Sequence, residues 1–134
     1  MSRDNAQFLR RGYEALHRGD IESFEAMSRE RLDPEFSFHS HWAGRVFRGI
    51  AGTQEWISDI RETWDDYDQE LEEIVDLGDD VLVVGRASAR GSGSGVPVTQ
   101  EFAVVWTFEG ERAIRARSFS SRAEALKTVG SSEP

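Results

Sequence analysis

Two of the three histidines in this 134-residue chain lie one residue apart, in the segment SFHSHW at positions 37–42. Imidazole titrates near neutral pH without perturbation, so His39 and His41 are candidates for moving a proton. Residues at i and i+2 of a strand share a face, and the two rings would therefore point the same way. Phe36 and Phe38 occupy the opposite face, which favours a surface or interface position for the histidines. A bend after the strand could still turn His41 toward the interior.

The same histidine pair does not make a metal site. Two imidazoles are too few ligands for zinc, and no third ligand is identifiable. The acidic segment at 64–81 holds nine Asp and Glu residues and no Lys or Arg. Counted from Asp66, however, Leu71 and Leu77 stand where a calcium loop needs Gly and Glu. We therefore expect a solvated acidic face, no metal and no cofactor.

Tyr13 and the arginines each allow two interpretations. Tyr13 lies on the apolar stripe of the first predicted helix, as a core aromatic residue or as a hydrogen-bond donor to a pocket. Arg86 and Arg90 share one strand face, as do Arg115 and Arg117. We expect an outward arginine ladder that pairs with the acidic strand, and an anion site for a carboxylated substrate is the alternative. The four tryptophans belong mostly to a core, and one or two of them lining a pocket would suit a flat aromatic ligand.

Composition indicates one globular domain. Hydrophobic residues make up 38% of the chain and charged residues 31%, and this length can bury one sizeable core. The formal net charge of −9 argues against a nucleic-acid partner, because phosphate backbones are bound through clustered cations. The sequence shows no membrane-span run, no signal-peptide pattern and no cysteine. We expect a cytoplasmic protein that binds neither nucleic acid nor membrane, with a domain over residues 1–130 and a disordered tail over 131–134.

The first third of the chain is predicted to be helical. Apolar residues at spacings of three and four indicate a first helix that ends at Gly19, and Asp20 is placed to cap a second helix. Pro34 closes that helix, and PEFSFHS follows as a strand with alternating faces. A loop, WAGRVFRG, then leads to a third helix from Ile50 or Gly52 to Trp64.

The later segments alternate strand and turn. Four strands are predicted, at 69–77, 81–90, 96–108 and 112–120, and a short helix capped by Ser120 or Ser121 follows. The short connections between these strands imply antiparallel pairing. Helices followed by an antiparallel sheet make an α+β domain. A curved sheet wrapped around the three helices would enclose one open-ended apolar hollow.

Five segments occur here in an order that is similar to a known superfamily: YEALHRGD, PEFSFHS, IVDLGDDV, ARGSGSG and RARSFSSRAEAL. The chain resembles the SnoaL-like branch of the nuclear-transport-factor-2-like superfamily, over roughly residues 5–130. The resemblance implies a cone-shaped α+β barrel, in which a curved antiparallel sheet encloses a deep pocket. It also implies a homodimer formed across the sheet. Members include ketosteroid isomerases, polyketide cyclases, dehydratases and epoxide hydrolases.

The resemblance also suggests where site residues would lie. Ketosteroid isomerases place an acidic base at the end of the first strand, a position held here by Ser40, or by His39 if the register slips by one. Their oxyanion-hole acid lies near Val104, where the segment FAVVWTF carries no acid. Tyr13 could supply the phenol of such a site. The catalytic candidates are therefore His39, His41 and Tyr13, and the ligand-binding candidates are Phe38, Ser40, Trp42, Trp56 and Trp106.

Three functions remain open, because a fold does not fix a function. The first is a cofactor-free acid–base enzyme, an isomerase, cyclase or dehydratase, that acts on a small apolar or polycyclic molecule. The second is a protein that binds such a molecule without chemistry. The third is a dimeric scaffold whose own side chains fill the pocket.

Overall fold

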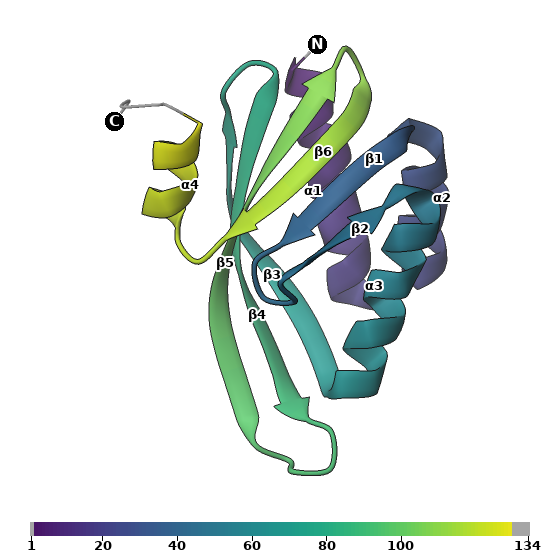
Figure 1. Cartoon of the computed structure of the whole chain (residues 1–134), viewed down its shortest axis with the longest axis vertical. Coiled ribbons are helices and arrows are strands. Elements are labelled where there is room, and N and C mark those ends of the chain that lie inside the picture. Colours follow the sequence, from purple (N-terminus) through teal and green to yellow (C-terminus); the bar gives the residue numbers. More distant parts are fainter. Residues whose placement is uncertain (1, 130–134) are drawn as a thin grey trace.

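The computed structural model describes residues 2–129, which form four helices and six strands (Figure 1). The predicted α+β class is confirmed. The predicted tail at 131–134 lies outside the described residues. Within residues 2–129, no helix has the length and apolar character needed to cross a membrane. The elements follow in the order α1 (Ser2–Arg18), α2 (Ile21–Arg31), β1 (Leu32–Ser40), β2 (Arg45–Arg48), α3 (Gly49–Thr63), β3 (Trp64–Asp76), β4 (Asp80–Gly91), β5 (Pro97–Glu109), β6 (Arg112–Phe119) and α4 (Arg122–Thr128).

Local signals set the helix boundaries that the sequence predicts. Gly19 follows α1 with a φ of +75°, a left-handed conformation that glycine adopts without strain. The Asp20 carboxylate accepts a hydrogen bond from the backbone amide of Ser23 at 3.1 Å and so caps α2. Ser121 caps α4 in the same way, through the amide of Glu124. These three predictions are confirmed.

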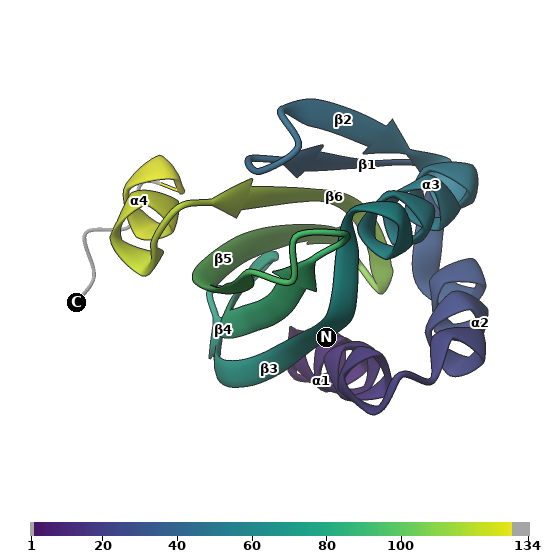
Figure 2. The same ribbon diagram turned by 90° about the horizontal axis from the view of Figure 1, so that it is seen from below.

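The six strands form one curved sheet in the order β2-β1-β6-β5-β4-β3. The strands β2 and β3 are its free edges, so the sheet does not close into a full barrel. Neighbouring strands are antiparallel except β1 and β6, which run parallel. The predicted meander did not include this pair, because its two strands are separated by residues 41–111, about half of the chain. Helices α1, α2 and α3 lie within the curve of the sheet, and α4 lies apart from them (Figure 2).

The stretch predicted as a loop before α3 contains a strand, and that prediction was wrong. Arg45–Arg48 form β2, in which Phe47 lies beside Phe38 of β1. The Phe47 side chain is 1% exposed, and its ring stacks on that of Phe38 with 6.1 Å between centroids. Four residues are too few for a periodic pattern, and pairing with β1 is what makes this segment extended. The strand predicted at 69–77 likewise starts earlier, at Trp64, directly after α3.

The two faces of the sheet bury separate apolar clusters. On the concave face, Phe8 and Tyr13 of α1 pack with Phe102 and Val104 of β5. On the convex face, α4 covers a smaller cluster made of Leu82, Val84, Ala103, Val105 and Ala125. One sheet therefore serves as the wall of two compartments, and the concave one holds the cavity described below.

Gly85 of β4 marks a close approach between strands. A Cβ atom at this position would lie 2.4 Å from the carbonyl oxygen of Glu70 and 2.5 Å from the Phe102 ring. The Glu70 oxygen belongs to the backbone of the neighbouring strand and cannot move without disturbing the ladder between β3 and β4.

We expect Gly85→Ala to lower the free energy of unfolding by about 1–3 kcal/mol, because overpacking forces the backbone to shift. Chemical denaturation followed by tryptophan fluorescence measures the change. Gly12→Ala is the matched control, since a Cβ atom at this α1 position meets nothing within 4 Å. It should be neutral or stabilise the helix by up to about 1 kcal/mol. Equal losses from the two substitutions would contradict the role given to Gly85.

Candidate functional site

A cavity of about 390 Å³ lies between the concave face of the sheet and helices α1, α2 and α3. Aromatic side chains dominate its walls. The chain has four tryptophans and two tyrosines, and all six line the cavity. They are Trp42, Trp56, Trp64, Trp106, Tyr13 and Tyr67, joined by the phenylalanines Phe8, Phe24, Phe36, Phe38 and Phe102. The cavity is therefore built to contact a ligand through rings.

Small residues in β4 make room for this cavity. Ala87 and Ala89 line it, and the strand register places Ala87 directly between Gln69 of β3 and Gln100 of β5. Side chains in register on neighbouring strands share a face. The middle strand thus contributes a methyl group where both neighbours contribute long amide side chains. The result is a trough whose floor is β4.

Tyr13 joins α1 to the sheet at one end of the cavity. The Trp106 indole N–H donates a hydrogen bond to the Tyr13 hydroxyl oxygen at 3.1 Å. The Tyr13 ring stacks on Phe102 with 5.9 Å between centroids, and the Trp106 ring stacks on Phe36 at 5.6 Å. Burial raises the pKa of Tyr13, against a smaller lowering by the indole hydrogen bond. The phenol therefore stays protonated, as a core aromatic residue that also faces the cavity.

A bulge at the start of β3 accompanies a second polar pair. The register shifts between Asp65 and Asp68, and Asp66 has a φ of +54°, which aspartate tolerates better than most residues. Beyond the bulge, the Gln69 side-chain amide donates to the Tyr67 hydroxyl oxygen at 2.6 Å. Burial raises the pKa of Tyr67, so its hydroxyl keeps a proton to donate. The Gln69 Oε1 atom is buried and has no partner within residues 2–129.

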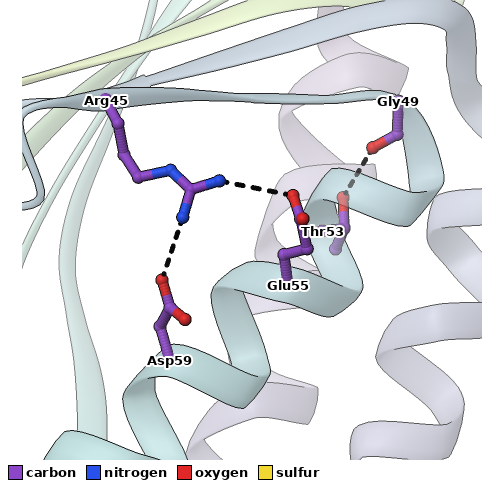
Figure 3. Close-up of polar contacts among 5 residues, drawn as sticks. All are labelled: Arg45, Gly49, Thr53, Glu55 and Asp59. Carbon is purple, nitrogen blue, oxygen red and sulfur yellow. Dashed lines mark hydrogen bonds and ion pairs between the residues drawn. The ribbon is translucent and has the colours of Figure 1, made fainter.

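Strand β2 holds α3 against the sheet. The Arg45 guanidinium lies between Glu55 and Asp59 on α3, at 3.5 Å from each carboxylate (Figure 3). The Thr53 hydroxyl donates to the Gly49 carbonyl oxygen at 3.4 Å in the first turn of the same helix. Exposed ion pairs of this kind add little stability. They agree with an orientation of α3 that turns its apolar face to the cavity.

The inward face of α3 carries Trp56. Its ring packs edge-on against Phe38 of β1 at 6.1 Å and against Tyr67 of β3 at 6.5 Å between centroids. Trp56 thus bridges two strands that lie far apart in the order of the sheet. Together with Ile60 on the next turn of the helix, it closes the cavity on the side opposite α1.

The structure divides the predicted site residues into two groups. Six of the eight line the cavity: Tyr13, Phe38, Ser40, Trp42, Trp56 and Trp106. His39 and His41 are not among the lining residues. A catalytic role for His39, His41 or Tyr13 stays a prediction.

His39 lies on the convex face of β1. The Ser37 Oγ atom and the His39 Nε2 atom are 3.0 Å apart and share a hydrogen bond. Burial lowers the pKa of His39, and the positive charges of Arg115, Arg48 and Arg117 lower it further. The ring therefore lies among cations, on the opposite side of the sheet from Phe36 and Phe38.

His41 lies in the exposed turn that follows β1. Its backbone amide donates to the Ser118 hydroxyl oxygen at 2.6 Å. Its ring packs edge-on against Trp42 with 5.0 Å between centroids. Trp42 lines the cavity and is still 53% exposed, so it lies at the cavity rim. His41 precedes Trp42 in the chain and does not itself line the cavity.

Some lining residues carried no usable sequence signal. The strand pattern did not single out Tyr67 or Gln69, because the bulge at Asp66 interrupts the alternation on which that pattern depends. Phe24 and Met27 of α2 also line the cavity. No three His, Asp or Glu side chains within the described residues lie together as metal ligands would.

The four strand arginines considered in the sequence analysis differ in whether they form ion pairs with the acidic strand. Arg86 pairs with Glu72 at 3.3 Å, and Arg90 pairs with Asp66. The expected pairing between β4 and the acidic strand β3 is therefore confirmed for these two. Arg115 and Arg117 form no ion pair with that strand among the described residues.

His17 at the end of α1 forms a hydrogen-bonded pair with Asp68 of β3. Its Nδ1 atom lies 2.8 Å from the Asp68 carboxylate. The hydrogen bond to Asp68, and then the charge of that carboxylate, raise the pKa of His17. A raised folded-state pKa means that the pair stabilises the fold fully below the unfolded value of 6.5. That contribution is lost as the pH rises through the folded-state pKa.

Comparison with known families identifies the family to which the chain belongs. Residues 9–116 match the SnoaL-like domain, a span that includes most of the cavity. The chain belongs to the SnoaL-like family, and the predicted resemblance to that family is confirmed. A search of the curated proteins found no match.

Solved structures with low sequence identity share this fold. A nuclear-transport-factor-2-like protein from Burkholderia thailandensis is 19% identical, with a TM-score of 0.76 over 97% of this chain and 98% of that one. A candidate SnoaL-like polyketide cyclase from Jannaschia sp. CCS1 is 21% identical, with a TM-score of 0.73 over 97% and 93% of the two chains. TerC, co-crystallised with polyporic acid, is 20% identical, with a TM-score of 0.73 over 95% and 98%.

Replacing His17 tests the tie between α1 and β3. We expect His17→Gln to lower the melting temperature more at about pH 5.5 than at about pH 8.5, because the charged pair exists only while the imidazole is protonated. Thermal unfolding at the two pH values measures the difference. Asp68→Asn should give the same pH dependence, and the double variant should add nothing to it. A loss that is the same at both pH values would contradict a charged pair.

Proposed function

We propose that this protein binds a small, uncharged aromatic molecule in its cavity and does not transform it. The observation that supports this is the character of the lining. The described residues around the cavity are aromatic, aliphatic or neutral polar. A charged ligand would lose its hydration there and find no counter-charge, which costs several kcal/mol or more. A neutral ligand has no such cost.

The arrangement of rings favours a flat ligand with at least one polar group. Stacked and edge-on pairs surround the trough formed by Ala87 and Ala89, and planar molecules fit between such faces. The polar group would meet the Tyr67 hydroxyl, which can donate a hydrogen bond while it accepts one from Gln69. The ligand would therefore carry an acceptor such as a hydroxyl or carbonyl oxygen.

The relatives are compatible with this proposal without specifying the ligand. TerC was crystallised with polyporic acid, which shows that a member of this fold was studied with a small organic molecule. Ser40 and Val104 stand where the resemblance to ketosteroid isomerases would place acids. Both line the cavity here, so its interior keeps neutral side chains at these two positions.

Acid–base catalysis at the rim is the second candidate. His41 packs against Trp42, and Trp42 lines the cavity. A ligand that protrudes past Trp42 would therefore come near an imidazole. In this version the cavity holds the apolar body of a substrate, and His41 moves a proton at its exposed end.

Binding can be tested with two matched fluorescent probes. We expect N-phenyl-1-naphthylamine, which is uncharged, to bind with saturation and to quench the tryptophan fluorescence, because all four tryptophans line the cavity. Anilinonaphthalene sulfonate has the same ring system with a negative charge, and it should bind at least about tenfold more weakly.

A blocked cavity is the control for this experiment. Ala87→Phe would place a ring on the floor of the trough and should abolish probe binding. Ala123→Phe makes the same change at an exposed position of α4 and should leave binding unchanged. Circular dichroism verifies that both variants fold. Equal affinity for the two probes, or binding that survives in Ala87→Phe, would refute the proposed site.

The catalytic candidate predicts turnover that depends on His41. Isomerisation of a β,γ-unsaturated ketosteroid to its conjugated form is followed by ultraviolet absorbance. His41→Gln should lower kcat by about 100-fold or more if the imidazole transfers the proton. His17→Gln, which changes a histidine that does not line the cavity, should leave kcat unchanged. Absence of turnover in the wild-type protein, or full activity of His41→Gln, would exclude this version for that substrate class.

A further inference from the structure

Three arginines meet on the convex face of the sheet, on the side away from the cavity. The register places Ser37 of β1 directly between Arg48 of β2 and Arg115 of β6. Two residues further along β1, His39 lies beside Arg117 of β6. Residues in register share a face, and residues two apart on a strand do as well. These five side chains therefore stand on one patch that spans three neighbouring strands.

The cations of this patch lack the partners that other arginines have. Arg86 and Arg90, on the same face of the sheet, pair with Glu72 and Asp66. Among the described residues, Arg48, Arg115 and Arg117 form no ion pair. Clustered like charges repel one another, and in a chain of net charge −9 such a cluster does not follow from overall composition.

One acid on this side of the sheet is already engaged. Asp80 of β4 accepts a hydrogen bond from the Thr107 hydroxyl at 2.6 Å. Thr107 pairs in register with both Asp80 and Arg115, which puts Asp80 two strands away from Arg115. One carboxylate at that distance leaves the patch with a net positive charge.

Arg117 contributes a second, independent observation. Its Nε–H group is buried and has no hydrogen-bond partner within residues 2–129. A buried donor without an acceptor costs about 1–3 kcal/mol, and more when the group is charged. Burial, followed by the charge of Arg115, lowers the pKa of Arg117, which agrees with two guanidinium groups that lie close together. An anion beside the two guanidinium groups would neutralise the pair.

We propose that Arg48, Arg115 and Arg117, together with Ser37 and His39, bind a doubly charged oxyanion of the phosphate type on the convex face. This site is separate from the cavity and does not depend on the function proposed for it. Arg48 and Arg115 stand on strands about 10 Å apart, with β1 between them. Guanidinium groups from both sides can reach an anion held above Ser37, and each can donate two parallel hydrogen bonds to it.

The remaining two groups are neutral donors that suit the same ligand. The Ser37 hydroxyl and the His39 ring already share a hydrogen bond, so their positions are fixed relative to each other. Ser37 and the neutral ring have two hydrogens between them and use one in their own hydrogen bond, so this pair has one hydrogen left for an oxygen atom of the anion. A tetrahedral oxyanion has enough oxygen atoms to meet three cations and these donors at once, whereas a carboxylate has only two.

Inorganic phosphate is the probe for the test. Isothermal titration calorimetry of the full chain, with phosphate replacing chloride at constant ionic strength, should show saturable binding. Arg48→Gln and Arg115→Gln should each weaken binding at least tenfold. Both side chains are exposed, so neither substitution should prevent folding. Arg86→Gln is the matched control, because it removes an exposed convex-face arginine that already has a partner, and it should not change the phosphate affinity.

Three results would overturn the proposal. The first is the absence of saturable phosphate binding by the wild-type chain. The second is an equal loss of affinity in Arg86→Gln, which would mean that phosphate responds only to net charge. The third is sedimentation velocity in which Arg115→Gln dissociates a larger assembly while phosphate has no effect. That result would assign the patch to contact with a second copy of the chain.

Discussion

The contact between Tyr13 and Trp106 connects the two halves of this molecule. One side chain comes from the first helix and the other from the long central strand β5, and their hydrogen bond ends in the wall of the cavity. Stacking on Phe102 and Phe36 extends this contact along and across the sheet. Because these rings are large and their polar atoms are paired, they hold the helix away from the small residues of β4. The cavity remains open because the Tyr13–Trp106 contact separates the helix from the sheet at one end and Trp56 does the same at the other end.

The sheet separates two chemical environments that the net charge of the chain does not reveal. Its concave face is aromatic and neutral around the cavity, whereas part of its convex face carries three arginines that form no ion pair within residues 2–129. Strand alternation produces this separation residue by residue, as in β1, where Phe36 and Phe38 point inward while Ser37 and His39 point outward. A ligand for one face would therefore differ in charge from a ligand for the other.

Neutral side chains also change what this cavity can do compared with the enzymes that the sequence resembles. The resemblance to ketosteroid isomerases would place acids at Ser40, or His39 if the register slips by one, and near Val104, and none of these positions holds an acid. The hydroxyl groups of Tyr13 and Tyr67 remain as hydrogen-bonding groups, and burial keeps both phenols protonated. Such groups orient a ligand well and give or take protons poorly near neutral pH. The described residues that line the cavity thus offer hydrogen-bonding groups and no charged side chain.

Much of this protein could be determined from the sequence by itself, because the relevant signals are local. Gly19, Asp20 and Ser121 mark helix boundaries through backbone conformation and capping, and alternation in β1 identifies which residues face inward. The apolar hollow follows from such patterns, but its aromatic character was underestimated, because all four tryptophans line the cavity where one or two were expected. Tertiary structure alone decided the rest: the parallel pairing of β1 with β6, the short strand β2, and the placement of Tyr67 and Gln69 beyond a bulge. It also gathered Arg48, Arg115 and Arg117 around Ser37. Strand β2 depends on pairing with β1 across a short turn. The other features depend on contacts between segments distant in the chain, whose energies no window of neighbouring residues contains.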